Sequence, residues 1–195
     1  PYRVSTKLVV IDEAQDYTLL QYKIIKLLFR NTDFTILGDV NQTINPFYKY
    51  DNLNILENIF DGISKYVELN KTYRSSPEII EYSNKILDLK HSSAVRRNNN
   101  IPIKTYDKLD YNLLINKINE LKYKYNSVAI ITKSIDEAQI VYGNIKNKIN
   151  DINIVDIDTD KFNKNFLIIP AYASKGLEFD SVIIINNFDK DKYLY

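Results

Sequence analysis

The chain has 195 residues, is 45% hydrophobic and carries a net charge of +1 at pH 7. That length allows one sizeable domain or two small ones around a buried core, and the near-neutral charge argues neither for nor against nucleic acid. Cysteine is absent, which excludes a disulfide scaffold and cysteine-ligated metal sites. No signal peptide or long apolar span occurs in the sequence, so we expect a cytoplasmic protein without a membrane partner.

Short apolar runs alternate with amphipathic stretches along the chain. The predicted strands are residues 8–11, 35–37, 66–69, 128–132, 152–157, 166–169 and 182–185. The predicted helices are residues 17–29, 77–89, 113–125 and 137–149. The first helix carries four aliphatic residues at helical spacing, Leu20, Ile24, Leu27 and Leu28. This alternation predicts α/β architecture with a mainly parallel sheet.

Two local features refine this organisation. The second predicted helix follows Ser76, a favoured N-cap residue, and has Pro77 at its first position. The most polar stretch, HSSAVRRNNN at residues 91–100, has no apolar period and predicts a loop. It is the best candidate for a linker or a domain boundary.

The first predicted strand ends in a dense acidic cluster, LVVIDEAQD at residues 8–16. Ligands of open α/β sheets bind at the carboxyl ends of strands. A strand that delivers Asp12 to Mg²⁺ would form half of a nucleotide site, and the adjacent Glu13 could take a proton from attacking water. Alternatively, Asp16 caps the helix at Tyr17 and the other carboxylates are solvated. That alternative explains Asp16 but gives no reason for Asp12 and Glu13.

Three further segments place polar residues next to predicted strands. FTILGDVNQTI, residues 34–44, repeats the design; Gly-Asp is a common turn pair, yet Gln42 is well placed to sense a γ-phosphate. LNKTYRSSPEI, residues 69–79, offers the planar fork of Arg74 to phosphate, although Tyr73 could simply pack and Arg74 could form a surface ion pair. IIPAYASKGLEFDSVIII, residues 168–185, could be an ordinary turn with Gly176 at positive φ.

The order DEAQD, LGDVNQ, TYRSS and SKGLEFD resembles the UvrD/Rep-like group of superfamily 1 helicases, from about residue 8 to 185. The acidic run followed by YTLLQYKII is most similar to the HelD branch, whose members act on bacterial RNA polymerase. The resemblance implies two RecA-like lobes of the P-loop NTPase type, with ATP in the cleft between them. Residues 1–70 would be the C-terminal part of the first lobe, and residues 71–195 the second lobe, truncated before its last motif.

The resemblance also implies roles for the residues of the first acidic motif. Asp12 would hold Mg²⁺, and Glu13 would be the catalytic base. Gln15 and Asp16 complete the motif and would link the nucleotide site to neighbouring motifs.

The second and third motifs would act on the phosphates and the base. Gln42 would contact the γ-phosphate or the attacking water, with Asp39 organising its loop. Tyr73 would stack on the adenine, and Arg74 would reach across the cleft as an arginine finger.

The last motif would approach both ligands. Gly176 and Glu178 would touch the ribose or triphosphate. Tyr172, Ser174 and Lys175 lie where the family's motif also approaches the nucleic-acid strand.

Parts of the family's machinery are missing from these 195 residues. No GxxxxGK[ST] occurs, because the glycines at 38, 62, 143 and 176 are isolated, and no late arginine motif follows SKGLEFD. We therefore expect a fragment of a larger protein that is inactive alone. The family's large helical insertion between TYRSS and SKGLEFD is also absent, which favours a compact or HelD-like member.

The predicted function of the full-length protein is that of an ATP-dependent superfamily 1 DNA helicase or translocase acting on single-stranded DNA. The alternative is a HelD-like ATPase module that binds and remodels RNA polymerase. A non-catalytic domain that kept the fold is a third possibility, which the intact Asp12, Glu13, Gln42 and Arg74 argue against. The sequence does not indicate an oligomeric state.

Overall fold

The structure is a computed structural model that describes residues 6–43, 49–60, 64–88, 93–95, 101–156, 159 and 165–186. The chain divides into two compact units, residues 1–101 and 102–195. The division follows directly after the polar segment 91–100 that the sequence marks as a boundary candidate. The assignment of residues 71–101 to a second lobe stays a prediction.

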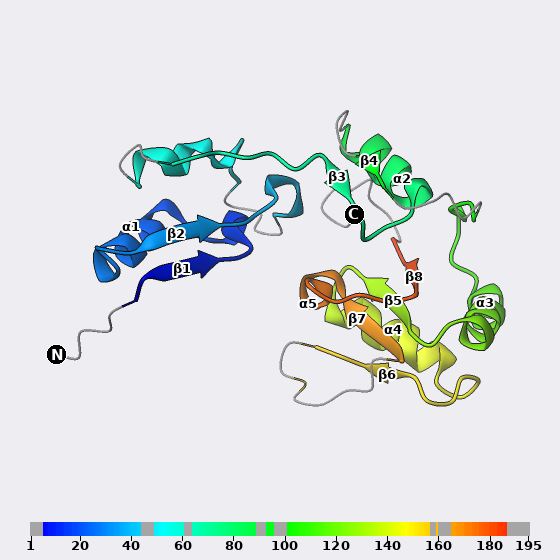
Figure 1. The fold of residues 1–195 in the computed structure, drawn as a ribbon. Coiled ribbons are helices and arrows are strands. Elements are labelled where there is room, and N and C mark those ends of the chain that lie inside the picture. Colours follow the sequence, from blue (N-terminus) through cyan, green and yellow to red (C-terminus); the bar gives the residue numbers. More distant parts are fainter. Residues whose placement is uncertain are drawn as a thin grey trace. The chain divides into compact units, whose positions relative to one another are not determined.

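The first unit is built around two parallel strands. Strand β1, Leu8–Ile11, pairs with β2, Asp33–Ile36, so that Ile11 lies opposite Ile36. The helix α1, Leu19–Leu28, connects them (Figure 1). This part of the unit also holds three short 3₁₀ turns, namely η1 at Ala14–Asp16, η2 at Val40–Gln42 and η3 at Leu53–Asn58.

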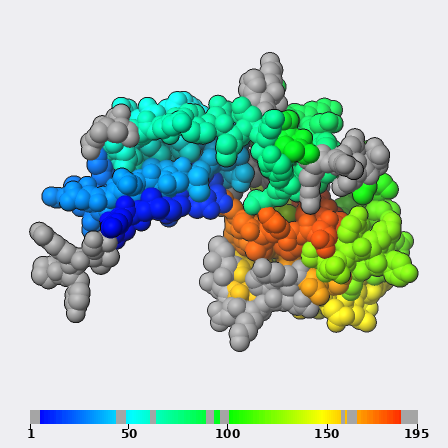
Figure 2. All heavy atoms as spheres, viewed as in Figure 1, coloured from blue at the N-terminus to red at the C-terminus, as the bar shows by residue number. Residues whose placement is uncertain are grey.

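Buried side chains from α1, both strand ends and η3 form the core of this unit. The buried members are Ile11, Ala14, Tyr22, Tyr50 and Leu56, of which Ala14 and Tyr22 are completely buried. The segment around η3 lies directly against the β1–α1–β2 segment in the space-filling view (Figure 2). Phe60 provides the contact, because its ring packs 4.7 Å from that of Phe34 and edge-on against that of Tyr22.

The N-terminus of α1 is fixed by a capping box. Thr18 accepts a hydrogen bond from the backbone N–H of Gln21, and the Gln21 side chain accepts one from the Thr18 backbone. The expectation that Asp16 caps this helix is therefore wrong: Asp16 belongs to η1, two residues upstream of the cap. The preceding 3₁₀ turn delays the start of the helix.

The aliphatic stripe that identifies α1 in the sequence is not the stripe that faces the core. The exposed fraction of the residues in this stripe is 47–71%; they are Leu20, Ile24, Leu27 and Leu28. Tyr22 is the buried residue of this helix. The helix prediction is confirmed, whereas the side chain that anchors the helix is a tyrosine.

The predicted strand at 66–69 is wrong, since residues 64–70 are exposed and form neither helix nor strand. The strand β3 lies just beyond, at Lys71–Thr72, and pairs in parallel with β4, Ser93–Ala94. The predicted loop 91–100 therefore contains two strand residues; its other residues, except Val95, lie outside the described part of the chain. Helix α2, Pro77–Leu87, follows β3.

The second unit holds a parallel four-stranded sheet in the order β6-β7-β5-β8. The strands are β5 (Val128–Thr132), β6 (Asn153–Ile154), β7 (Phe166–Pro170) and β8 (Ser181–Ile184). The helices are α3 (Tyr111–Lys124), α4 (Ile135–Ile145) and the single turn α5 (Ala171–Ser174). Each of these strands was predicted from its apolar run, to within a few residues; residue 157 of the predicted 152–157 strand lies outside the described residues.

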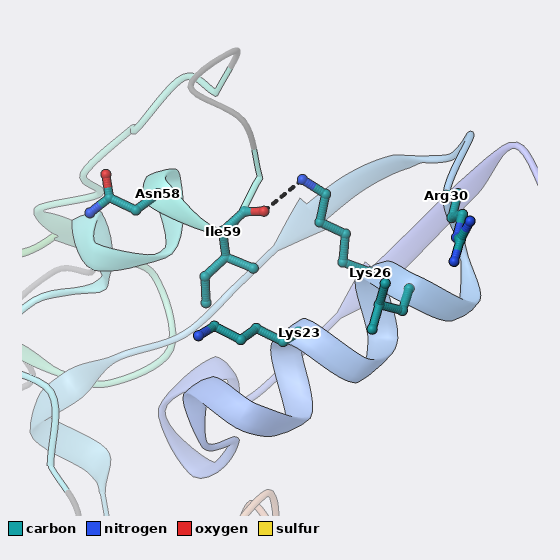
Figure 3. A pocket seen from close by; sticks show the side chains of 6 residues that line it. Lys23, Lys26, Arg30, Asn58 and Ile59 are labelled. Carbon is teal, nitrogen blue, oxygen red and sulfur yellow. Dashed lines mark hydrogen bonds between the residues drawn. The ribbon is translucent and has the colours of Figure 1, made fainter.

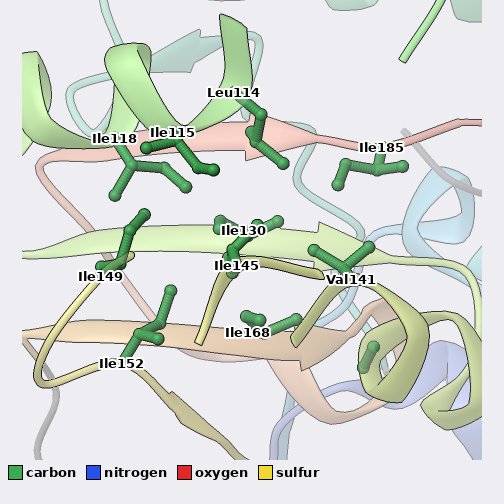
Figure 4. Packing of buried hydrophobic residues seen from close by; sticks show 11 residues of the cluster. Leu114, Ile115, Ile118, Ile130, Val141, Ile145, Ile149, Ile152, Ile168 and Ile185 are labelled. Atoms are coloured by element: carbon green, nitrogen blue, oxygen red, sulfur yellow. The ribbon is translucent and has the colours of Figure 1, made fainter. Parts of the chain in front are cut away.

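Alternate residues of the central strands bury opposite faces of this sheet. Ile130 and Ile168 pack against α3 and α4 on one face (Figure 4), whereas Ala129 and Leu167 pack beside α5 on the other. Burial on both faces explains why these strands read as continuous apolar runs. Among the described residues, no helix is long and apolar enough to cross a membrane.

Candidate functional site

The segments that follow β1 and β2 meet at one edge of the first sheet. The parallel register brings the ends of both strands level, and the Leu37 N–H donates to the carbonyl of Ile11 at 2.8 Å. The Ala14 N–H then donates back to the Leu37 carbonyl at 2.9 Å. Backbone hydrogen bonds thus join the acidic motif after β1 to the LGDVNQ motif after β2.

Glu13 has a left-handed backbone conformation, with φ 53° and ψ 45°. This conformation is uncommon for residues other than glycine and costs of order 1 kcal/mol or more. It reverses the chain sharply before η1, and the Asp12 carboxylate accepts a hydrogen bond from the Glu13 N–H at 2.8 Å. The two carboxylates therefore sit on a tight turn rather than on a strand.

Gln15 joins the two motifs with both ends of its side-chain amide. It is completely buried. Its Nε2 donates to Glu13 Oε2 at 2.7 Å, and its Oε1 accepts from the backbone N–H of Asp39 at 3.0 Å. Gln15 thereby orients the Glu13 carboxylate relative to the second motif.

Asp39 passes this chain of hydrogen bonds on to Gln42. One Asp39 carboxylate oxygen accepts from the Asn41 N–H at 2.9 Å, which caps η2. The other accepts from Gln42 Nε2 at 3.0 Å. A path of hydrogen bonds consequently runs from the Glu13 side chain through that of Gln15 to the Asp39 backbone N–H, and from the Asp39 carboxylate to Gln42.

Gly38 makes this close approach possible. A Cβ atom placed on Gly38 would lie 2.7 Å from the Cβ of Ala14 and 2.8 Å from Gln15 Oε1. Both distances are shorter than van der Waals contact. Glycine is required here by the packing of the two turns.

The donor set at the acidic turn fits Mg²⁺. Asp12 is exposed, Glu13 is half-buried, and both supply hard carboxylate oxygens. Mg²⁺ is commonly held by one or two carboxylates, with water and phosphate oxygens completing its shell. Within the described ranges, no cluster of three or more His, Asp or Glu side chains could hold a metal ion.

Tyr73 and Arg74 follow β3, in the β3–β4 pair rather than in the β1–β2 pair. Tyr73 is 72% exposed, and the Arg74 N–H donates to Thr72 Oγ1 at 3.3 Å. Ser76 begins α2 without a side-chain capping bond, and Pro77 holds the first helical position. The approach of Tyr73 and Arg74 to a nucleotide stays a prediction.

The SKGLEFD motif forms a turn between β7 and β8 in the second unit. Gly176 has φ +78°, as an ordinary turn requires, and the Leu177 N–H donates to the Ser174 carbonyl at 3.0 Å. The Tyr172 hydroxyl donates to Asp156 at 2.9 Å. Glu178 is exposed, and Lys175 is half-buried. This local geometry leaves the predicted ligand contacts of the motif untested.

Sequence reasoning missed several residues that shape these turns. Asp180, the last residue of SKGLEFD, accepts from the backbone N–H groups of Asn126 and Ser127 and so ties β8 to the start of β5. The Thr-x-x-Gln spacing at Thr18 was a readable signal for the helix cap. Tyr22 had no such signal.

A separate surface pocket of about 450 Å³ lies beside the C-terminal half of α1 (Figure 3). Lys26 spans it, donating from Nζ to the Ile59 carbonyl at 2.6 Å. Its other lining residues are Lys23, Leu27, Arg30 and Asn58. None of the predicted site residues lines it.

The parallel sheets, flanking helices and polar strand ends define a mixed α/β protein consistent with a RecA-like helicase fold. Residues 1–61 match the UvrD/REP helicase N-terminal domain, so this part of the chain is similar to UvrD/Rep-like helicases. This match confirms the family resemblance found in the sequence. It does not single out the HelD branch.

Individual proteins that the chain resembles are also helicases by name. The chain is 37% identical over 86 residues to "ATP-dependent DNA helicase srs2" of Schizosaccharomyces pombe, covering 43% of this chain and 10% of that protein. It is 34% identical over 85 residues to "ATP-dependent DNA helicase Rep" of Buchnera aphidicola subsp. Acyrthosiphon pisum, covering 40% and 12%. The R568 protein of Acanthamoeba polyphaga mimivirus is 26% identical over 202 residues, 90% of this chain and 28% of its own length. The chain thus spans about a tenth of srs2 and Rep.

Proposed function

We propose that this chain is part of an ATP-dependent DNA helicase or translocase, with ATP hydrolysis at the sheet edge formed by the ends of β1 and β2. The observation that carries the proposal is the hydrogen-bond path from Glu13 through Gln15 and Asp39 to Gln42. It joins an acid–base group to an amide that suits a phosphate oxygen. A pair of ordinary surface turns would need no fully buried glutamine bonded to both of them.

In this proposal each residue of the path has a distinct task. Asp12 would hold Mg²⁺, which would supply positive charge to offset that of the phosphates. Glu13 accepts a proton from the attacking water. Gln42 contacts the γ-phosphate or that water, and Gln15 keeps Glu13 and the Asp39 loop in register.

Residues outside this path complete the proposed cycle. Tyr73 stacks on adenine, Arg74 stabilises charge on the transferred phosphoryl group, and Gly176 and Glu178 contact the ribose or triphosphate. Tyr172, Ser174 and Lys175 contact the nucleic-acid strand. Closure of two lobes, assigned to residues 1–70 and 71–195, couples hydrolysis to stepping along single-stranded DNA.

The names of the relatives support DNA as the partner, since srs2 and Rep are both named ATP-dependent DNA helicases. A HelD-like role on RNA polymerase rests on the similarity of the acidic run followed by YTLLQYKII, and on the absence of the family's large helical insertion between TYRSS and SKGLEFD. Cytoplasmic location and the inactivity of these 195 residues by themselves remain predictions.

The test is the steady-state ATPase rate of the full-length protein, titrated separately with single-stranded DNA and with RNA polymerase. We expect single-stranded DNA to raise the rate. Stimulation by RNA polymerase alone would favour the HelD-like role, and the absence of any ATPase activity would refute both.

A further inference from the structure

A buried tyrosine of α1 is bonded to the backbone of the acidic turn. Tyr22 is fully buried, and its hydroxyl donates to the carbonyl of Ala14 at 2.7 Å. Tyr22 lies eight residues along the chain from Ala14, on the helix that follows the turn. This bond connects the helix interior to the residue directly after Glu13.

The Ala14 residue is held from both sides. Its N–H donates to the Leu37 carbonyl at the end of β2, and its carbonyl accepts from Tyr22 and, at 3.3 Å, from the Tyr17 N–H. Its neighbours in sequence are Glu13 and Gln15. Whatever fixes the Ala14 backbone also fixes the directions in which those two side chains leave the turn.

The left-handed conformation of Glu13 makes such fixation necessary. A non-glycine residue keeps this conformation only where the surroundings over-determine it. The bonds to Ala14 supply that constraint on the side of the turn that faces α1 and β2.

We propose that Tyr22 is a positioning residue for the ATPase reaction: its hydroxyl holds the Ala14 carbonyl, and through it the Glu13 carboxylate and the Gln15 amide. The inference rests on the proposed function. It adds to the motif residues a side chain that touches neither nucleotide nor metal.

The hydroxyl, rather than the ring, carries this role. The ring packs against Tyr17, with centroids 5.8 Å apart, and edge-on against Phe60 at 6.3 Å. Phenylalanine would keep those apolar contacts. Tyr22→Phe therefore removes the bond to Ala14 while leaving the core filled.

The chain offers a matched control. Tyr50 is also buried, belongs to the same hydrophobic cluster, and donates its hydroxyl to a backbone carbonyl, that of Tyr17, at the same distance of 2.7 Å. Tyr50→Phe loses a bond of the same kind, but one outside the Glu13–Gln15 turn. A purely structural role predicts equal effects for the two variants.

The first measurement is the steady-state kinetics of the full-length wild type, Tyr22→Phe and Tyr50→Phe. A slightly misplaced base lowers the chemical rate more than nucleotide binding, so Tyr22→Phe should lower kcat roughly tenfold or more while KM for ATP stays within about twofold. Tyr50→Phe should stay near the wild type. Equal kcat values for the two variants would overturn the proposal.

The second measurement does not depend on catalysis. Hydrogen exchange of the amides of Ala14 and Asp39 reports directly on the hydrogen bonds that hold the Glu13–Gln15 turn. We expect these amides to exchange roughly fivefold faster in Tyr22→Phe than in Tyr50→Phe. If the wild type shows no ATPase, the proposed function fails, yet this comparison still decides whether Tyr22 holds the turn. Equal exchange in both variants would overturn the positioning role.

Discussion

The two hydrogen bonds of Gln15 explain why the acidic motif has an amide side chain at this position. It must donate to the Glu13 carboxylate and accept from the Asp39 N–H at the same time. A neutral amide offers both a donor and an acceptor in one planar group. An ionised carboxylate at this position could satisfy Asp39 but would repel Glu13.

We therefore expect Gln15→Glu to destabilise the protein by about 2 kcal/mol or more, because a second carboxylate would be buried beside Glu13. Urea unfolding at neutral pH measures the effect. Gln21→Glu is the control, since Gln21 is exposed and glutamate also suits its place in the capping box. Similar stabilities for the two variants would contradict the account of Gln15.

Gly38 gives a second prediction at the same scale. An added methyl group would overlap Ala14 and Gln15, so Gly38→Ala should force the two turns apart and cost about 1–3 kcal/mol. Beyond the neighbouring helix backbone, no atom lies within 4 Å of a Cβ added to Gly143 of α4, so Gly143→Ala should instead stabilise by about 0.5–1 kcal/mol. Opposite shifts in melting temperature are expected, and a neutral Gly38→Ala would refute the steric argument.

The sequence predicted which residues form the candidate site, but not the hydrogen bonds and close contacts that hold them. Polar residues after two neighbouring parallel strands must share an edge, which places Asp12 and Glu13 near Asp39 and Gln42. The identity of Tyr22 as the hydroxyl donor could not be predicted, because helical spacing cannot say which side chain reaches the turn. The requirement for Gly38 is likewise a distance between two loops, which no local pattern encodes.

The helices and strands themselves were largely predictable where burial is strong. β1 and β5 have the predicted bounds, since their apolar runs are cut off by polar residues at both ends. The failure at 66–69 has a physical reason: apolar residues form a strand only with a partner strand, and these residues remain exposed. The predicted start of α1 was wrong because two residues of favoured capping types, Asp16 and Thr18, lie two positions apart and either could act as the cap.

The cap of α1 can be tested directly. Thr18→Ala removes the side-chain acceptor for the Gln21 N–H and should lower the free energy of unfolding by about 1 kcal/mol. Ser76→Ala at the start of α2 is the control, because Ser76 makes no side-chain capping bond and should change stability less. If Ser76→Ala were the more damaging of the two in chemical denaturation, the assignment of the caps would be wrong.

Arg74 lies between the short strand β3 and the helix α2, so its backbone is flanked by regular structure on both sides. As the proposed arginine finger, its removal in Arg74→Ala should lower the ATPase rate of the full-length protein by about a thousandfold. A surface ion pair would instead contribute less than about 1 kcal/mol, so the melting temperature should barely change. Normal ATPase with normal stimulation by DNA would leave Arg74 as an ordinary ion pair.

At the scale of the whole molecule, two compact units carry different parts of the motif set. The Glu13–Gln42 path lies within the first unit, and the SKGLEFD turn lies within the second. A two-lobed ATPase requires residues of both lobes to act on one nucleotide. The central claim to test is therefore that the Glu13 turn of the first unit takes part in ATP hydrolysis.

The most direct test is Glu13→Gln in the full-length protein, with ATPase rate and Mg-ATP affinity measured side by side. The amide keeps the size of the side chain but cannot accept the proton from water. The account predicts that turnover falls roughly a hundredfold or more while ATP affinity is kept. A turnover rate within a few-fold of the wild type would contradict it.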